Sequence, residues 1–322
     1  MIDNAVHAIA DDPADAVLRN ELAHGDAVIG TIGPILRHLL TIDDHPVFSE
    51  EIVARVNGMM ADVASQLLAE LSVAAGETDD RGHSAQSAAS LVRCFVAHPG
   101  FLSHTHALAL EWQLTERLHT RLALDPVLSP LLQAQFASPD PATANLAMSL
   151  LASQVRFTQT QRRMQLTLAE LPGDLLHAAL LAMRHLGEQE EPAQTYAKQA
   201  EAAIRSRFDE SRSRLGLISR LVTGMGGGAA AALSVTHAGV GVFLSALALA
   251  SGQDREMAVL ATTEGQRARL TLALRASGLT ADAAEEQFLT LHPELSLPAG
   301  FERLGSAQAA EMLACSSVFP GN

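Results

Sequence analysis

The chain has few cysteines and almost no lysine, and each shortage argues against a class of function. Only Cys94 and Cys315 occur in 322 residues, far apart and without a CxxC pair. A disulfide framework or a structural zinc site is therefore not expected, and a reducing compartment suits this composition. Lys198 is the single lysine, and the formal net charge is −14. Because nucleic acids and anionic membranes attract positive surfaces, we expect neither as a partner.

The beginning of the chain lacks the features of a secretory signal. Residues 1–17, MIDNAVHAIADDPADAV, have neither a basic start nor an apolar run. We therefore expect a cytoplasmic protein. With 48% hydrophobic residues, the chain can bury a substantial core.

Sustained alternation with a period of two is also absent, and apolar residues recur instead at spacings of three and four. Residues 50–71, EEIVARVNGMMADVASQLLAEL, and residues 106–122, HALALEWQLTERLHTRL, are examples. Asp140 before Pro141 and Thr280 before ADAAEEQFL are typical helix starts. The predicted fold class is all-α.

Loop-like breaks suggest how the chain is organised. They fall at residues 74–84, 98–100, 124–141 and 187–192. After the last break, arginines and carboxylates are interleaved, which is typical of a solvated helix or an interdomain spacer. We expect an N-terminal helical domain over residues 1–187, a charged helix or spacer over 188–215, and a C-terminal domain of helical hairpins over 216–322.

The C-terminal part contains an internal similarity. Residues 243–260, FLSALALASGQDREMAVL, and residues 270–289, LTLALRASGLTADAAEEQFL, each read as an alanine- and leucine-rich helix, a Ser-Gly stop and a second helix. Gly252 and Gly278 suit the left-handed conformation that ends helices. Repeated hairpins stack because one hairpin cannot bury its own apolar face. The sequence therefore predicts a helical bundle followed by an α-solenoid-like array of short hairpins.

These segments also carry a family resemblance. Residues 243–293, with LALASG, RLTLALRASGL and FLTLHP, together with residues 150–176, LLASQVRFTQTQRRMQLTLAELPGDLL, resemble the second half of an uncharacterised bacterial family of helical, HEAT-like proteins. The resemblance implies stacked helical hairpins. It assigns no catalytic residue, because that family has no established activity.

A glycine-rich stretch, GMGGGA at residues 224–229, matches the G-x-G-x-x-A form of a dinucleotide fingerprint. Such a fingerprint follows the first strand of an alternating strand–helix array, which this sequence lacks. A short-chain dehydrogenase would also need Tyr-x-x-x-Lys further along, whereas Tyr196 and Lys198 lie upstream. We expect a turn between helices here and no bound cofactor.

The uncharged run at residues 229–250 is long enough to cross a bilayer. Only eight of its residues are Leu, Val or Phe, and Gly239-Val240-Gly241 interrupts it. We therefore favour buried helices joined by a turn, with a membrane span as the alternative.

Histidines supply the main candidates for chemistry. His98, His104 and His106, with Asp43-Asp44-His45, resemble a metal site, but His104 and His106 would lie about 200° apart around one helix. Cys94 and His98 could pair on one helix face, although a cysteine buried beside Leu91 and Phe95 is the simpler interpretation. We assign no metal ligand.

The remaining candidates are weaker. No GxSxG motif occurs, and the carboxylate pairs Asp43-Asp44 and Asp79-Asp80 lie in loop-like segments, where we expect them to be solvated. His24 or His106 would serve as a phosphoryl acceptor if the chain were a histidine phosphotransfer protein.

The sequence thus favours a non-enzymatic cytoplasmic scaffold for protein–protein interaction or regulation. No catalytic, cofactor-binding or metal-binding residue is assigned, a protein partner is expected, and a homo-oligomer is compatible with the sequence. The alternatives are a histidine phosphotransfer-type signalling protein and an enzyme with a histidine-lined metal site.

Overall fold

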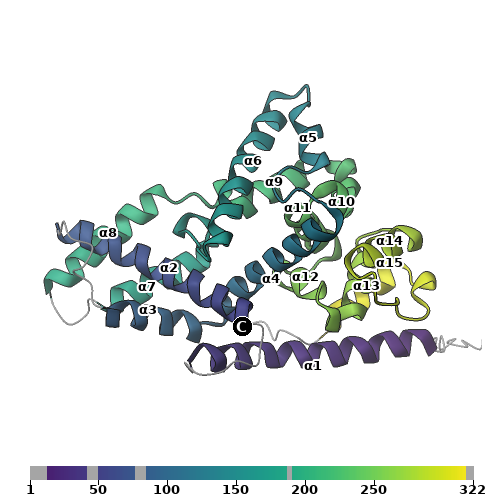
Figure 1. Cartoon of the computed structure of the whole chain (residues 1–322), viewed down its shortest axis with the longest axis horizontal. Coiled ribbons are helices and arrows are strands. Elements are labelled where there is room, and N and C mark those ends of the chain that lie inside the picture. Colours follow the sequence, from purple (N-terminus) through teal and green to yellow (C-terminus); the bar gives the residue numbers. More distant parts are fainter. Residues whose placement is uncertain (1–12, 42–49, 77–84, 187–190, 317–322) are drawn as a thin grey trace, which may run out of the picture. The chain divides into compact units, whose positions relative to one another are not determined.

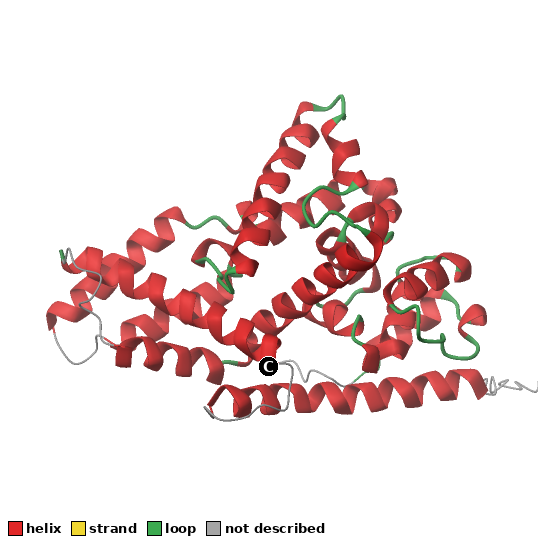
Figure 2. Cartoon of the chain, in the orientation of Figure 1, coloured by secondary structure: helices red, strands yellow, loops and turns green. Residues whose placement is uncertain are grey.

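The computed structural model describes residues 13–41, 50–76, 85–186 and 191–316. All secondary-structure elements in these ranges are helices, joined by loops, and the ranges contain no strand (Figure 2). The all-α prediction is confirmed. None of the helices within these ranges combines the length and apolar character needed to cross a bilayer.

The chain folds into two compact units, one from residues 1–31 and 247–322 and the other from residues 32–246. Two helices, α1 (Pro13–Thr41) and α11 (Val240–Ser251), continue from one unit into the other. This division does not coincide with the three segments expected from the sequence. Contacts between residues distant in sequence define the units, and local composition does not reveal such contacts.

The unit formed by residues 32–246 is drawn in purple, blue, teal and green in Figure 1. Its further elements are α2 (Glu50–Ala75), α3 (Ala85–Ala97), α4 (Pro99–Leu122), α5 (Pro130–Phe136), α6 (Pro141–Arg162), η1 (Leu168–Glu170), α7 (Gly173–Leu186), α8 (Glu191–Arg207), η2 (Glu210–Arg212), α9 (Arg214–Gly224), η3 (Gly226–Leu233) and α10 (Val235–Ala238).

Helix α2 lies at the centre of one core, where it packs against α3, α4 and α8. Its apolar residues recur at helical spacing and are fully buried, as at Val56, Met60 and Val63. The charged segment that was expected to be a solvated helix or a spacer forms α8. Its Ala200 and Ile204 join this core, so the segment is a packed helix with one charged face.

The predicted helix starts on described residues are confirmed. The Asp140 carboxylate accepts hydrogen bonds from the backbone N–H groups of Ala142 and Thr143 at 3.2 and 3.0 Å, at the beginning of α6. The Thr280 hydroxyl caps the helix α14 (Ala281–Leu291) by accepting from the N–H of Ala283 at 3.3 Å.

The unit formed by residues 1–31 and 247–322 contains the second set of helices. These are α12 (Arg255–Ala261), η4 (Glu264–Gln266), α13 (Arg267–Ala276), α14 (Ala281–Leu291), η5 (Phe301–Arg303) and α15 (Ser306–Ala314). Gly252 and Gly278 have φ angles of 69° and 89°, so both predicted helix stops are confirmed. Helix α13 packs against α12, α14 and α15, an arrangement compatible with stacked hairpins.

The beginning of α1 belongs to this second unit through polar contacts. Glu21 forms two hydrogen bonds with Arg267, at 2.7 and 3.1 Å, and Asp26 pairs with Arg269. Both Asp26 and Arg269 are buried. These pairs join residues more than 240 positions apart in the sequence, which is why composition did not predict them.

Candidate functional site

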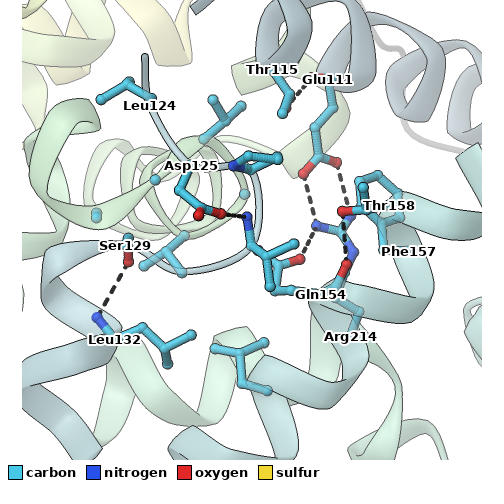
Figure 3. Close-up of a pocket in the computed structure, with 18 of the residues that line it drawn as sticks. Glu111, Thr115, Leu124, Asp125, Ser129, Leu132, Gln154, Phe157, Thr158 and Arg214 are labelled. Atoms are coloured by element: carbon cyan, nitrogen blue, oxygen red, sulfur yellow. Dashed lines mark hydrogen bonds and ion pairs between the residues drawn. The ribbon is translucent and has the colours of Figure 1, made fainter. Parts of the chain in front are cut away.

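A buried ion pair joins α4 to α9 in the unit formed by residues 32–246. The Arg214 guanidinium donates to the Glu111 carboxylate through Nη1 at 2.8 Å and Nη2 at 2.9 Å. The two side chains are 2% and 1% exposed. The fork geometry matches two nitrogens to two oxygens, the strongest arrangement for this pair of groups (Figure 3).

Helix α6 holds the guanidinium from another side. The Phe157 ring lies under it, with 3.6 Å between the guanidinium carbon and the ring centroid, and Gln154 Oε1 accepts from Nη1 at 3.4 Å. The backbone N–H of Arg214 donates to Glu170 Oε2 at 2.7 Å. Burial of the charge is therefore offset by a carboxylate, an amide and an aromatic face.

The turn between α10 and α11 closes over this ion pair. A Cβ on Gly241 would lie 2.8 Å from Arg214 Nη1 and 3.0 Å from Glu111 Oε1. Gly239 has a φ of 78°, and α10 ends directly before it. The predicted interruption of the uncharged run at Gly239-Val240-Gly241 is thus confirmed, and its glycines permit the backbone to approach the charged groups.

The cavity beside the ion pair has a volume of about 20 Å³, enough for about one water molecule. Trp112 and Thr115 line it, with Leu132 and Ser129 from α5 and its N-cap (Figure 3). Because the guanidinium and the carboxylate face each other and leave so little space, this polar cluster is suited to holding α4, α6 and α9 together. A substrate of ordinary size does not fit.

Sequence reasoning did not identify this cluster. Arg214 belongs to the charged segment 188–215, whose arginines were expected to be solvated. Glu111, between Leu110 and Trp112, was not proposed as a functional residue. The available signal was the run ALALEW in the middle of α4, where Glu111 is the one charged residue among apolar ones. A carboxylate in such a run tends to be buried and then needs a cationic partner. The identity of that partner, 103 positions away, has no local signal.

A second, larger cavity of about 140 Å³ lies at the C-terminal end of α6. Its lining includes Leu108 of α4, Phe157 and Gln161 of α6, the segment 165–167, Glu170 of η1, and Arg214 and Leu215 of α9. Arg156 and Arg163 also line it, and both are exposed. It thus combines apolar walls with cationic, amide and carboxylate groups.

The outward face of α6 is the most distinctive surface near this cavity. Met148 and Val155 are 58% and 38% exposed, and they share one side of the helix with the exposed Ala152, Gln159 and Arg162. Helix α6 contains no acidic residue, although the whole chain has a net charge of −14. In Figure 1, α5 and α6 project from the rest of their unit, with their connecting loop at the tip.

The candidate histidines do not converge. His98 caps α4, and its Nδ1 accepts from the N–H of Phe101 at 3.3 Å. His104 is buried, whereas His106 is partly buried, and burial lowers the pKa of His106 to about 4. In the part of the chain that the structure describes, no three His, Cys, Asp or Glu side chains are placed to hold a metal ion. Asp43-Asp44-His45 lies outside the described residues.

The other candidates are dispersed as well. Cys94 is exposed, so the expectation that it is buried with Leu91 and Phe95 is wrong. Helix α3 buries the side that carries Leu91 and Phe95, and Cys94 lies beyond the edge of that side. His24 is exposed on α1, which keeps it accessible as a phosphoryl acceptor. Asp79-Asp80 lies outside the described residues.

The glycine-rich segment does not adopt the strand–turn–helix form of a nucleotide site. It ends α9 at Gly224 and continues as the 3₁₀-helix η3. Added Cβ atoms at Gly227 and Gly228 would meet nothing within 4 Å. Comparisons of the chain with protein-family models, with curated proteins and with solved structures found no match.

Proposed function

We propose that this chain is a cytoplasmic scaffold that binds a partner protein through the outward face of α6, and that its helical hairpins belong to the HEAT-like class. The observation that carries the proposal is the face itself, with Met148, Ala152 and Val155 spaced at i, i+4 and i+7 and all exposed. A helix of a partner that lies along such a stripe would bury these side chains.

Charge indicates the kind of partner. Arg156, Arg162 and Arg163 lie on or beside this face, and no carboxylate of the described residues forms an ion pair with them. Among the acidic groups of this unit, Glu51 and Glu116 pair with Arg55, and Glu170 accepts from the backbone N–H of Arg214. The face therefore suits an amphipathic segment that carries acidic side chains beside its apolar ones.

A photo-crosslinking side chain at position 155, introduced in the intact protein in its native cells, tests this proposal. We expect a crosslinked partner whose attached peptide is acidic and amphipathic, in a complex that weakens as salt concentration rises. The matched control is a crosslinker at position 73, because Val73 is an exposed apolar residue of α2, at 74% exposure. Equal crosslinking at both positions, or a basic peptide at position 155, would contradict the proposal.

Substitutions then distinguish a loss of binding at this face from a loss of folding. With the identified peptide as the probe, Val155→Asp and Arg162→Glu should each weaken binding at least tenfold, whereas Val73→Asp should not. Trp112, the single tryptophan, lies beside the buried ion pair, so an unchanged fluorescence spectrum shows that the unit is still folded. Undiminished binding by both face variants would rule this face out.

A further inference from the structure

The 140 Å³ cavity at the end of α6 has the size of a small-molecule site. Apolar cavities of about 150 Å³ accept benzene, so a body of four to six carbon atoms fits. Leu108, Phe157, Leu166 and Leu215 provide apolar walls for such a body. Arg156 and Arg163 are exposed residues of the lining, so we infer that the mouth of the cavity, with room for a polar head group, lies beside them.

The two arginines favour an anion at this mouth. Both residues line the cavity and are exposed, and neither forms an ion pair with a carboxylate of the described residues. Guanidinium groups bind carboxylates with two parallel hydrogen bonds. A ligand with a carboxylate at one end would therefore be held at the entrance.

A carboxylate lies further along the lining. Glu170 Oε2 accepts from the backbone N–H of Arg214 at 2.7 Å, which leaves Oε1 to accept from a ligand. Gln161 of the same lining is 1% exposed, and its Nε2 contacts the Gln165 carbonyl oxygen and Met59 Sδ, each at 3.4 Å, so its amide is held in the wall. The Glu170 carboxylate suits a ligand that donates hydrogen bonds, most of all an ammonium group.

The wall of the cavity is held in place by α2. Asp62 accepts from the N–H of Leu166 at 3.1 Å, and Gln66 Nε2 donates to the Leu166 carbonyl at 2.9 Å. Met164 takes a positive φ of 56°, and a Cβ on Gly58 would lie 2.8 Å from its carbonyl oxygen. A cavity that is fixed before the ligand arrives costs less ordering on binding.

From these observations we propose that the cavity binds a free apolar α-amino acid. The carboxylate lies at Arg156 and Arg163, the ammonium group donates to the Glu170 carboxylate, and the aliphatic side chain contacts the leucines. The site shares Arg156 and Arg163 with the charged edge of the docking face, whereas the exposed stripe of Met148, Ala152 and Val155 does not line the cavity. The ligand is recognised by three features together, an anion, a donor and an apolar body.

Calorimetric titration of the full chain with three probes tests each feature. L-leucine carries all three, 4-methylpentanoate lacks the ammonium group, and 3-methylbutylamine lacks the carboxylate. We expect leucine to bind at least tenfold more tightly than 4-methylpentanoate, and the amine to show no binding. No heat with leucine at millimolar concentration, or an amine that binds as well as leucine, would overturn the proposal.

Variants test which residues bind the carboxylate of the ligand and which bind its ammonium group. Arg156→Gln with Arg163→Gln should weaken leucine binding at least tenfold, whereas Arg93→Gln, at an exposed arginine of α3, should leave it unchanged. Glu170→Gln should reduce the preference for leucine over 4-methylpentanoate. Unaltered leucine binding by the double arginine variant would place the ligand elsewhere.

The docking variants keep the two proposals separate. Val155→Asp lies on the outward face and does not line the cavity, so it should bind leucine like the unmodified chain. Leucine binding without a crosslinked partner would therefore support the cavity and count against the docking face. A crosslinked partner without leucine binding would support the docking face and count against the cavity.

Discussion

At the scale of single residues, the Glu111–Arg214 pair is a feature whose loss the fold tolerates poorly. Both groups are almost completely buried, so neither can recover water when the other is removed. The pair also shows what sequence reasoning could not reach. Sequence patterns indicate which positions are apolar. They do not indicate which two buried charged residues form a pair when 103 positions separate the two residues.

Glu111→Gln should therefore destabilise the unit formed by residues 32–246 by about 3 to 5 kcal/mol, because it leaves the guanidinium buried without a counter-charge. Urea unfolding followed by Trp112 fluorescence measures this, since Trp112 lines the same small cavity. The double variant Glu111→Leu with Arg214→Met should recover most of the loss, because two apolar side chains replace the pair. A loss below about 1 kcal/mol in the single variant would show that water reaches the site.

At the scale of elements, the sequence predicted helices and their ends well. Helix starts at Asp140 and stops at Gly252 and Gly278 depend on local chemistry, which the sequence contains in full. The faces of helices were less predictable. Cys94 was expected on the buried side of α3, and the exposed apolar side of α6 was not recognised, because the surface that each helix buries is chosen by its neighbours in space.

The stop at Gly278 gives a prediction for the helix hairpin formed by α13 and α14. Gly278→Ala should lower the free energy of unfolding by about 1 to 2 kcal/mol, because an alanine resists the positive φ of 89° at this position. Gly265→Ala is the matched control in the same unit, since it has open space and an ordinary φ. Circular dichroism during urea unfolding compares the two. Equal effects would mean that the stop does not depend on glycine.

At the scale of the whole molecule, the sequence predicted a domain boundary near residues 188–215. In the structure, residues from the beginning and the end of the chain, 1–31 and 247–322, form one unit together. The difference is physical. A charged, alanine-rich segment resembles a linker in composition, but its few apolar residues lie on one side of α8 and enter the core around α2. Contacts such as Asp26 with Arg269 depend on where the chain returns, which composition does not encode.

Asp26→Asn tests this division directly. It leaves the buried Arg269 without its carboxylate, so the unit that contains both should lose about 3 to 5 kcal/mol. Hydrogen exchange followed by mass spectrometry should then show faster exchange in peptides from residues 13–31 and 247–316. The informative peptides come from residues 216–246, which the sequence assigned to the C-terminal hairpins and the structure assigns to the unit formed by residues 32–246. Unchanged exchange there supports the structural division, whereas faster exchange together with the C-terminal helices would support the boundary expected from the sequence.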